Sequence, residues 1–439
     1  MFRPIYYIIL YLLSNEMQNK RRCHRYLPQR ARSQFSCRPK TRYTVTGKGH
    51  DTRRVVMIIN EANVRKVIPV AGGKGGVGKS VITANLGILL SSYAKQTVAI
   101  DLDLGGSNLH TYLGMKNRNA GIGNFLSDRS VKFNDLITDT PYRYLRFVPG
   151  DVLVAGLGSI QQSQRNSIVS RIEKIDADYI LMDLGSGTGL NVIDFFLISN
   201  SGFVVTTPQT PAILNAYSFL KNVAFRQLQR SCTSPKSVVS YLKEVVRDKS
   251  PGGTPTIREI LRKIRSISAP AGKTAKEAVA ALKPQLVINM AETPEDIQMG
   301  ENLRDLITRN LEINIGCLGV VYYDSGVNQA VRELKPFVVH AHDSIAAVEL
   351  DRIAQKIIHS PRFPDMPIDT DEYAGSFELA EVEAQNDYAE IEGAPEAAAG
   401  AEDGELDVSH EEYAAIIAAQ RQEIENLKGT VRMLTMNQR

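Results

Sequence analysis

The stretch VIPVAGGKGGVGKSVITAN, residues 67–85, decides the fold of this chain. Its apolar start, residues 67–71, predicts a buried strand, and the glycines that follow predict a tight loop. From Ser80 onward the pattern predicts a helix that ends near Tyr93. A strand, a glycine loop and a helix in this order form a phosphate-binding unit, because backbone N–H groups can converge on phosphate oxygens there.

Two nucleotide motifs overlap in these glycines. Residues 73–80 fit the P-loop pattern, in which the lysine reaches the β/γ-phosphates and the following hydroxyl binds Mg²⁺. The same glycines fit the dinucleotide fingerprint, and Asp101 lies about where its ribose-binding acid would. Lys79 and Ser80 favour a nucleoside triphosphate, because a dinucleotide turn uses neither an ammonium group nor a magnesium-binding hydroxyl directly after its last glycine.

A second lysine, Lys74, lies inside the loop. With it, GKGGVGKS resembles the deviant Walker A box of the MinD/ParA family of ATPases. The resemblance implies ATP and Mg²⁺ as cofactors, and catalytic roles for Lys74, Lys79 and Asp103. The nucleotide-binding residues that it implies are Gly73, Lys74, Gly75, Gly76, Val77, Gly78, Lys79, Ser80, Val81 and Asn289.

Acidic residues close two further apolar runs. The run from residue 97 ends in Asp101 and Asp103, and the run from residue 179 ends in Asp183, before a glycine-rich loop. In parallel sheets such strand ends share the edge where ligands bind. In the family the first resembles switch I, with Asp103 orienting the attacking water. The second resembles Walker B with switch II. The resemblance implies Mg²⁺ near Ser80, Asp101 and Asp183.

The remaining apolar runs complete a sheet. Further strands are predicted at residues 144–149, 203–207, 286–289 and 317–322, with helices between them and a closing helix at 346–358. This alternation predicts an α/β fold, a doubly wound and mostly parallel P-loop NTPase sheet. The resemblance covers residues 66–358. It implies that Asn289 contacts adenine, although a buried and satisfied strand-end amide is the alternative.

Charge divides the chain. Residues 1–56 carry 13 Lys/Arg against two acids, and residues 365–412 carry 17 Asp/Glu and no Lys/Arg. We expect a basic extension at 1–56, disordered or outside the native start, and an ATPase domain at 57–360. We expect an acidic disordered linker at 361–410. The four cysteines show no CxxC pair, which gives no zinc or iron–sulfur site and favours a reducing compartment.

Residues 235–283 form a basic insertion with 11 Lys/Arg against four acids. Thr256 could cap a helix through Ile267, with an apolar stripe beneath a basic face. Two interpretations stay open. The stripe could meet an anionic membrane or a nucleic-acid backbone, or it could pack on its own domain and leave the basic side in solvent.

Periodicity returns at the C-terminal end, in residues 411–436. Apolar residues at 4-3 spacing, with one polar position, predict a coiled-coil or amphipathic helix. Three heptads are marginal alone, so we expect a partner helix. The family alternative is an amphipathic membrane helix, which four glutamates in this stretch oppose. The seam consists of Tyr413, Ile417, Gln420, Ile424, Leu427, Val431 and Leu434.

The resemblance implies an ATP-dependent dimerisation switch that positions a cellular structure, in cell division or in flagellar placement and number. The long variable ends and the stretch SGTGLNVIDFF, residues 186–196, resemble the MinD-like regulators of flagellar number, the FlhG/FleN group, more than plasmid partition proteins. The expected partners are a second copy of the chain on ATP binding and a protein activator or cargo adaptor. We expect a cytoplasmic protein, peripheral at the inner membrane face if a membrane surface binds it. The alternative is a ParA-type partition ATPase that binds nonspecific DNA.

Overall fold

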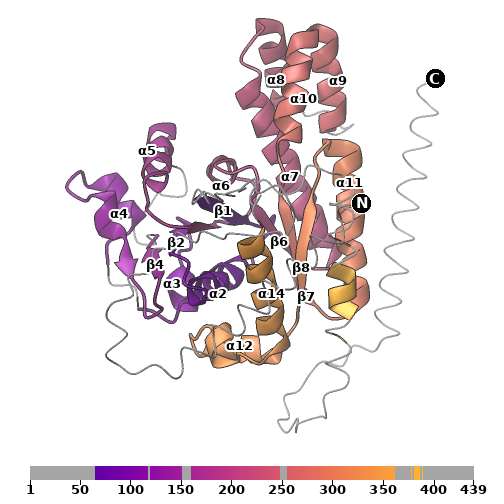
Figure 1. The fold of residues 1–439 in the computed structure, drawn as a ribbon. Helices are drawn as coiled ribbons and strands as arrows, with labels where there is room; N and C mark the ends of the chain where they lie inside the picture. The colour runs from indigo at the N-terminus through magenta and orange to yellow at the C-terminus, as the bar shows by residue number, and fades with distance from the viewer. Residues whose placement is uncertain are drawn as a thin grey trace, which may run out of the picture. The chain divides into compact units, whose positions relative to one another are not determined.

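The computed structural model describes residues 65–116, 119–150, 160–247 and 255–360, together with 377, 380–385 and 388. Within these residues the chain forms one eight-stranded sheet between two layers of helices (Figure 1). The strands are β1 Lys66–Ala71, β2 Thr97–Leu102, β3 Thr138–Asp139, β4 Leu145–Val148, β5 Tyr179–Leu184, β6 Phe203–Thr206, β7 Gln285–Ala291 and β8 Gly316–Tyr322.

Thirteen α-helices and two 3₁₀ turns lie in the described residues between 65 and 360. The helices are α2 Lys79–Ser92, α3 Leu109–Tyr112, α4 Ile122–Ser127, α5 Gln162–Ile172, α6 Leu190–Phe196, α7 Thr210–Ser231, α8 Lys236–Arg247, α9 Ile257–Ile267, α10 Ala269–Ala280, α11 Ile297–Leu311, α12 Ser325–Arg332, α13 Phe337–His340 and α14 Ile345–His359. The 3₁₀ turns are η2 Phe133–Leu136 and η4 Pro294–Asp296. Among the described helices, none is long and apolar enough to span a bilayer.

The sheet confirms the predicted doubly wound topology. Its order is β3-β4-β2-β5-β1-β6-β7-β8, and every pair is parallel except the short edge strand β3 on β4. β1 lies between β5 and β6, so the loop after β1 leaves the middle of the sheet. Asp101 pairs in register with Asp183 across β2 and β5, which brings the two acidic strand ends side by side. The carboxyl edge therefore gathers the predicted site residues.

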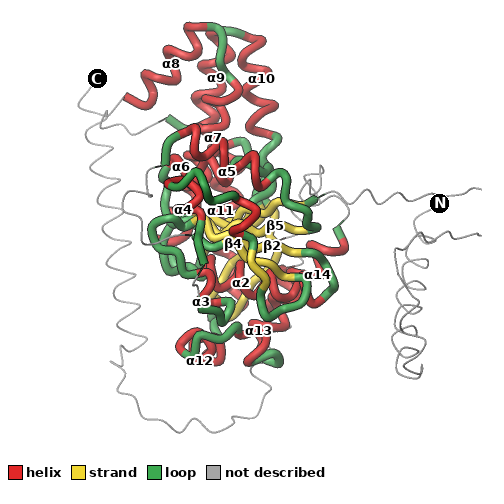
Figure 2. The backbone as a smooth tube through the Cα atoms, turned by 90° about the vertical axis from the view of Figure 1, so that its left-hand side faces the viewer, coloured by secondary structure: helices red, strands yellow, loops and turns green. Residues whose placement is uncertain are grey.

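Helices bury both faces of the sheet. Figure 2 shows the strands with α2, α3, α13 and α14 on one side and α5, α6 and α7 on the other. Leu86 of α2 and Leu350 of α14 belong to one buried cluster, and Ile168 of α5 and Phe219 of α7 belong to the opposite one. All six residues of β5 are buried, as expected for a parallel strand that is covered on both faces.

The described parts of the basic insertion, residues 235–247 and 255–283, are largely helical and lie between β6 and β7. Thr256 caps α9 as predicted: its hydroxyl accepts from the Glu259 N–H at 3.2 Å, and the Glu259 carboxylate accepts from the Thr256 N–H at 2.8 Å. The apolar stripe is buried within the domain, in the same cluster as α7 and α11 residues. This burial supports the packed interpretation. The buried residues are Ile257, Ile260, Leu261 and Ile264, and the exposed cations are Arg262, Lys263 and Arg265.

The prediction of a disordered acidic linker is wrong for part of its length. Residues 377, 380–385 and 388 are helical, and Phe377, Ala380 and Ala384 are buried in the core. Their spacing of three and four places them on one helix face, and that apolar face outweighs the acidic composition around it. The basic extension at 1–56 and the helix expected at 411–436 lie outside the described residues.

Candidate functional site

The glycine loop between β1 and α2 is enclosed by its neighbours. Gly78 has a φ of 88°, and a Cβ there would lie 2.1 Å from the side-chain nitrogen of Asn289. A Cβ on Gly73 would lie 2.1 Å from the carbonyl oxygen of Asn215 in α7. Glycine is required at both positions, because any side chain would displace a neighbouring element. The contact of Gly73 with α7 could not be read from the sequence.

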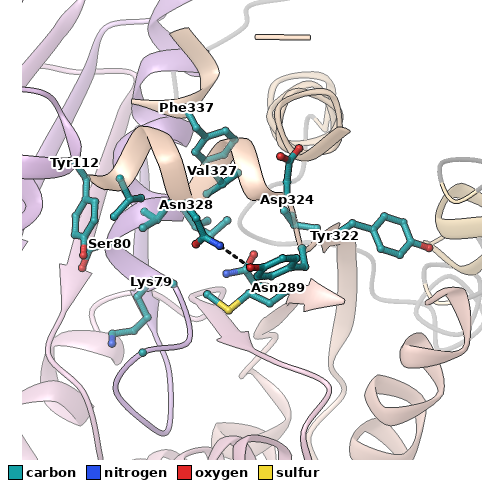
Figure 3. Close-up of a pocket in the computed structure, with 17 residues that line it drawn as sticks. Lys79, Ser80, Tyr112, Asn289, Tyr322, Asp324, Val327, Asn328 and Phe337 are labelled. Atoms are coloured by element: carbon teal, nitrogen blue, oxygen red, sulfur yellow. Dashed lines mark hydrogen bonds between the residues drawn. The ribbon is translucent and has the colours of Figure 1, made fainter. Parts of the chain in front are cut away.

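The two loop lysines occupy different environments. Lys79 is the first residue of α2 and is only 7% exposed, whereas Lys74 is exposed near the middle of the loop. The first N–H groups of α2 have no partner within the helix, so the loop and the helix start form an anion-binding concavity. Figure 3 shows Lys79 beside this loop. Lys79 is therefore enclosed beside this concavity, whereas Lys74 is exposed on the loop.

Asp183 lies directly beside the start of α2. Its carboxylate accepts a hydrogen bond from Ser80 and, at 3.5 Å, from the Thr83 hydroxyl. Burial and then the charge of Asp101 raise the pKa of Asp183, against the Ser80 hydrogen bond and the Lys79 charge. Burial likewise raises the pKa of Asp101. Two adjacent buried carboxylates favour a cation between them and a phosphate.

Asp101 organises the loop that follows β2. Its carboxylate accepts from the Ser107 hydroxyl at 2.6 Å, and from the N–H groups of Leu109 and Asp103 at 3.1 Å each. The sequence did not indicate this positioning of the loop. Asp103 is partly exposed at the loop start, and a Cβ on Gly185 would lie 3.2 Å from its carboxylate. The loops after β2 and β5 therefore touch at Asp103.

A pocket of about 260 Å³ opens beside Lys79 and Ser80, between the ends of β7 and β8 and the helix α12 (Figure 3). Asn289 borders it, and its amide donates to the Val77 carbonyl oxygen at 3.0 Å. Asp324 caps α12 through the Gly326 N–H at 2.7 Å, and Asn328 donates to the Tyr323 hydroxyl at 2.8 Å. The pocket offers aromatic, amide and carboxylate groups, which suit a nucleoside.

These residues fit a triphosphate with a magnesium ion. The glycine loop, Lys79 and the start of α2 could hold phosphates, and the Ser80 hydroxyl with Asp183 could hold the ion, directly or through water. Among the described residues, no three His, Cys, Asp or Glu side chains group closely enough to hold a metal by themselves. Such a group is not needed, because Mg²⁺ usually combines one or two protein oxygens with phosphate and water.

Several pocket residues were missed in the sequence. Tyr112 and Asn328 come from short helices that carry no motif, whereas Tyr323 and Asp324 did carry a signal, as residues directly after an apolar strand. Ser107, which bonds Asp101 and does not line this pocket, carried the weaker signal of a hydroxyl in a glycine-rich loop. Their convergence depends on how α3 and α12 pack, which no local pattern specifies.

The sequence of this chain is similar to those of known proteins. The septum site-determining protein MinD of Helicobacter pylori is 32% identical over 148 residues, which cover 34% of this chain and 54% of that protein. The flagellum site-determining protein YlxH of Helicobacter pylori is 31% identical over 169 residues, which cover 37% of this chain and 54% of that protein. The chain thus spans about half the length of the curated relatives it matches.

A solved structure and a family model also match. The septum site-determining protein MinD of Pyrococcus horikoshii, complexed with Mg-ADP, aligns over 67% of this chain and 96% of its own, at 19% identity and a TM-score of 0.46. The model of the CobQ/CobB/MinD/ParA nucleotide binding domain matches residues 68–337, from β1 through the phosphate loop and both acidic strand ends. Since that match covers more than half of the chain, this chain belongs to the CobQ/CobB/MinD/ParA nucleotide binding domain family.

Proposed function

We propose that this chain is an ATPase that dimerises when it binds ATP and uses the cycle of binding and hydrolysis to position a structure in the cell. One observation carries the proposal. A single glycine loop holds one buried lysine, Lys79, beside Ser80 and Asp183, and one exposed lysine, Lys74. The buried lysine suits the subunit's own triphosphate, and the exposed one suits a partner's.

The roles of the site residues follow from their positions. Lys79 and the loop N–H groups bind and orient the phosphates, and Ser80 and Asp183 hold the ion's coordination sphere in place. Asp103, at the contact between the two loops, orients the attacking water. Asp101 keeps Asp103 at that position through its hydrogen bonds to the loop. Bound Mg²⁺ would supply charge neutralisation on the phosphates.

Lys74 makes hydrolysis depend on assembly. An exposed ammonium group on the loop can approach the phosphates of a second subunit only when two nucleotide sites face each other. Charge stabilisation supplied from a partner speeds phosphoryl transfer in trans, as an arginine finger does. Each subunit would then hydrolyse ATP slowly alone and faster in the dimer.

The positioning role is drawn from the relatives. MinD is named as septum site-determining and YlxH as flagellum site-determining, and each matches more than a third of this chain. We infer that this chain serves the same kind of task, with a protein activator or cargo adaptor as its partner. Its alignment with YlxH is as extensive as that with MinD, which keeps flagellar placement beside cell division.

The ATPase rate per subunit, measured across protein concentrations, tests this function. The rate should rise with concentration and saturate once the dimer forms, and it should vanish without Mg²⁺. A rate per subunit that stays constant from nanomolar to high micromolar concentration would contradict the assembly step. No ATP turnover at any concentration would contradict the ATPase assignment itself.

A second candidate is a partition-type ATPase that binds nonspecific DNA. It is favoured by the exposed cations of α9 and by Lys273 of α10, on helices that extend away from the sheet (Figure 1). Phosphate contacts predict binding that needs ATP and weakens steeply with salt. Arg262→Glu with Lys263→Glu should then abolish DNA binding and keep ATPase activity. DNA affinity that is unchanged between 50 and about 200 mM salt would exclude this candidate.

A further inference from the structure

Residues 377, 380–385 and 388, called here the tail segment, pack on the side of the domain formed by β7, β8, α11 and α14. Phe377 is fully buried, and a Cβ on Gly300 of α11 would lie 3.3 Å from its ring. The guanidinium group of Arg304 lies 4.8 Å from the centre of the same ring. Gly300 therefore makes room for the Phe377 ring, and Arg304 covers it.

An ion pair ties the tail segment to the last strand. Lys356 of α14 and Glu383 lie 2.6 Å apart, with side chains that are 22% and 19% exposed. The same ammonium group donates to the carbonyl oxygen of Leu318 in β8 at 2.8 Å. One lysine thus joins three elements. Because the pair is mostly buried, it is screened less by solvent than a surface pair would be.

Tyr322, the last residue of β8, makes further contacts with the tail segment. Its hydroxyl donates to the carbonyl oxygen of Ala384 at 2.6 Å, and its ring centre lies 6.0 Å from that of Tyr388. Its backbone N–H donates to the Glu349 carboxylate of α14 at 2.7 Å. Figure 3 shows the Tyr322 ring directed away from Asn289 and Asn328. The tail segment therefore holds the side chain, while α14 holds the backbone.

The next residues along the chain form the wall of the nucleoside pocket. Tyr323 and Asp324 line it, Asp324 caps α12, and Asn328 of α12 bonds the Tyr323 hydroxyl. Tyr322 also borders the pocket, with its ring directed away, and the wall continues from it into Tyr323 and Asp324. A displacement of Tyr322 would therefore move the wall. Among the residues that the structure describes, no hydrogen bond joins the tail segment to the glycine loop on the other side of the pocket.

We propose that the tail segment fixes the nucleoside wall through Tyr322, a positioning residue, and thereby raises the affinity for ATP without acting on its phosphates. The inference rests on the proposed function, since it assigns this pocket to the nucleoside. A wall that is held in its bound position before binding loses less freedom when ATP arrives. By linkage, ATP must strengthen the docking of the tail segment by the same factor.

Calorimetry of the full chain with Tyr322→Phe tests the inference, with Mg-ATP and Mg-tripolyphosphate as ligands. The variant keeps the ring and removes the hydroxyl that donates to Ala384. We expect ATP affinity to fall about three- to tenfold, the range of one buried hydrogen bond, and tripolyphosphate affinity to stay unchanged. Equal losses for both ligands, or no loss for either, would overturn the inference. Failure of the wild-type chain to bind either ligand would instead overturn the proposed function.

A second experiment follows the linkage and does not depend on that variant. Hydrogen exchange at residues 380–385 should slow when Mg-ATP is added and stay unchanged with Mg-tripolyphosphate. Phe377→Ala should remove the protection, and Val382→Ala should retain it, because Val382 is 53% exposed on the outer side of the same segment. Protection by tripolyphosphate equal to that by ATP, or no protection by ATP, would contradict the coupling.

Discussion

The side-chain amide of Asn289 donates a hydrogen bond to the carbonyl oxygen of Val77 at 3.0 Å, which joins the end of β7 to the phosphate loop. The two residues are 212 positions apart in the chain. The same amide lies where a side chain at Gly78 would be. Asn289 therefore sets the position of the loop and borders the nucleoside pocket at once.

Asn289→Asp should weaken the binding of both the nucleoside and the phosphates of ATP. The variant keeps the shape but turns an oxygen toward the Val77 carbonyl, so the loop loses its hydrogen bond. Leaving a buried acceptor unpaired costs about 1–3 kcal/mol. We expect calorimetry to show about tenfold weaker binding of both Mg-ATP and Mg-tripolyphosphate. Asn328→Ala is the matched control, which should affect only ATP. Normal tripolyphosphate binding by Asn289→Asp would show that Asn289 serves the base alone.

Lys79→Ala should lose nucleotide binding and keep its fold. Hydrogen bonds from a charged donor contribute about 1.5–3 kcal/mol each, so ATP affinity should fall about a hundredfold or more. Circular dichroism should match the wild type. Lys273→Ala, a change at a side chain that is 79% exposed on α10, should bind ATP normally. Retained ATP affinity in Lys79→Ala would contradict the assignment of the phosphate site.

Asp103→Ala should bind ATP and hydrolyse it slowly. Loss of a group that orients the attacking water typically reduces the rate about 10²- to 10⁴-fold. The ATP-bound dimer should then accumulate, because hydrolysis no longer separates the subunits. Single-turnover hydrolysis and light scattering measure the two effects. Asp135→Ala, at an exposed position in η2, is the control. Unchanged turnover and a monomer in ATP would remove Asp103 from the mechanism.

Asp194 joins α6 to α5 and α7 through three guanidinium groups. Its carboxylate lies 2.7 Å from Arg226, 2.9 Å from Arg230 and 3.0 Å from Arg165. Burial alone would raise the pKa of Asp194, but the Arg226 hydrogen bond and the three positive charges hold it below the ordinary value of 3.8. A carboxylate with a lowered pKa stabilises the fold above its unfolded pKa, and that contribution is lost as pH falls through the folded pKa.

Asp194→Asn should therefore lower the free energy of unfolding at pH 7 by about 3 kcal/mol, the cost of leaving partly buried cations unpaired. The difference from wild type should shrink as pH falls below about 4, because the carboxylate of the unfolded chain protonates near that pH and the folded one only at a lower pH. Urea unfolding at several pH values measures it. Asp305→Asn, at a side chain that is 52% exposed, should change stability by less than about 1 kcal/mol. A loss of unfolding free energy that grows as pH falls would contradict a stabilising Asp194 carboxylate.

Much of the fold could be predicted because its signals are local. The predicted strand at 179–183 and the helix from Ser80 to Tyr93 correspond to β5 and α2 within one or two residues, since apolar runs and glycine breaks mark their ends. The edge strand β3 was missed, because two residues carry no periodicity. The helix of the tail segment was missed because the acidic residues around it obscured the helical spacing of three and four between Phe377, Ala380 and Ala384.

The site could be predicted only in its motif residues. The loop from Gly73 to Ser80 is one contiguous motif in which each required residue has a chemical role, and Asp183 closes a contiguous apolar run. The hydrogen bonds from Asn289 to Val77 and from Tyr322 to Glu349 and Ala384 join elements that are separated in the chain. Such contacts depend on how helices and strand ends pack, which propensity and periodicity do not encode.

The mass of the protein in solution, measured by light scattering with Mg-ATP and a slowly hydrolysed analogue, tests the central claim most directly. The wild-type chain should be a dimer with ATP and a monomer with ADP. Lys74→Ala should still bind ATP, remain a monomer and hydrolyse ATP at a rate that is independent of protein concentration. A Lys74→Ala chain that dimerises and hydrolyses ATP like the wild type would show that the exposed lysine does not serve a partner, and would contradict the account.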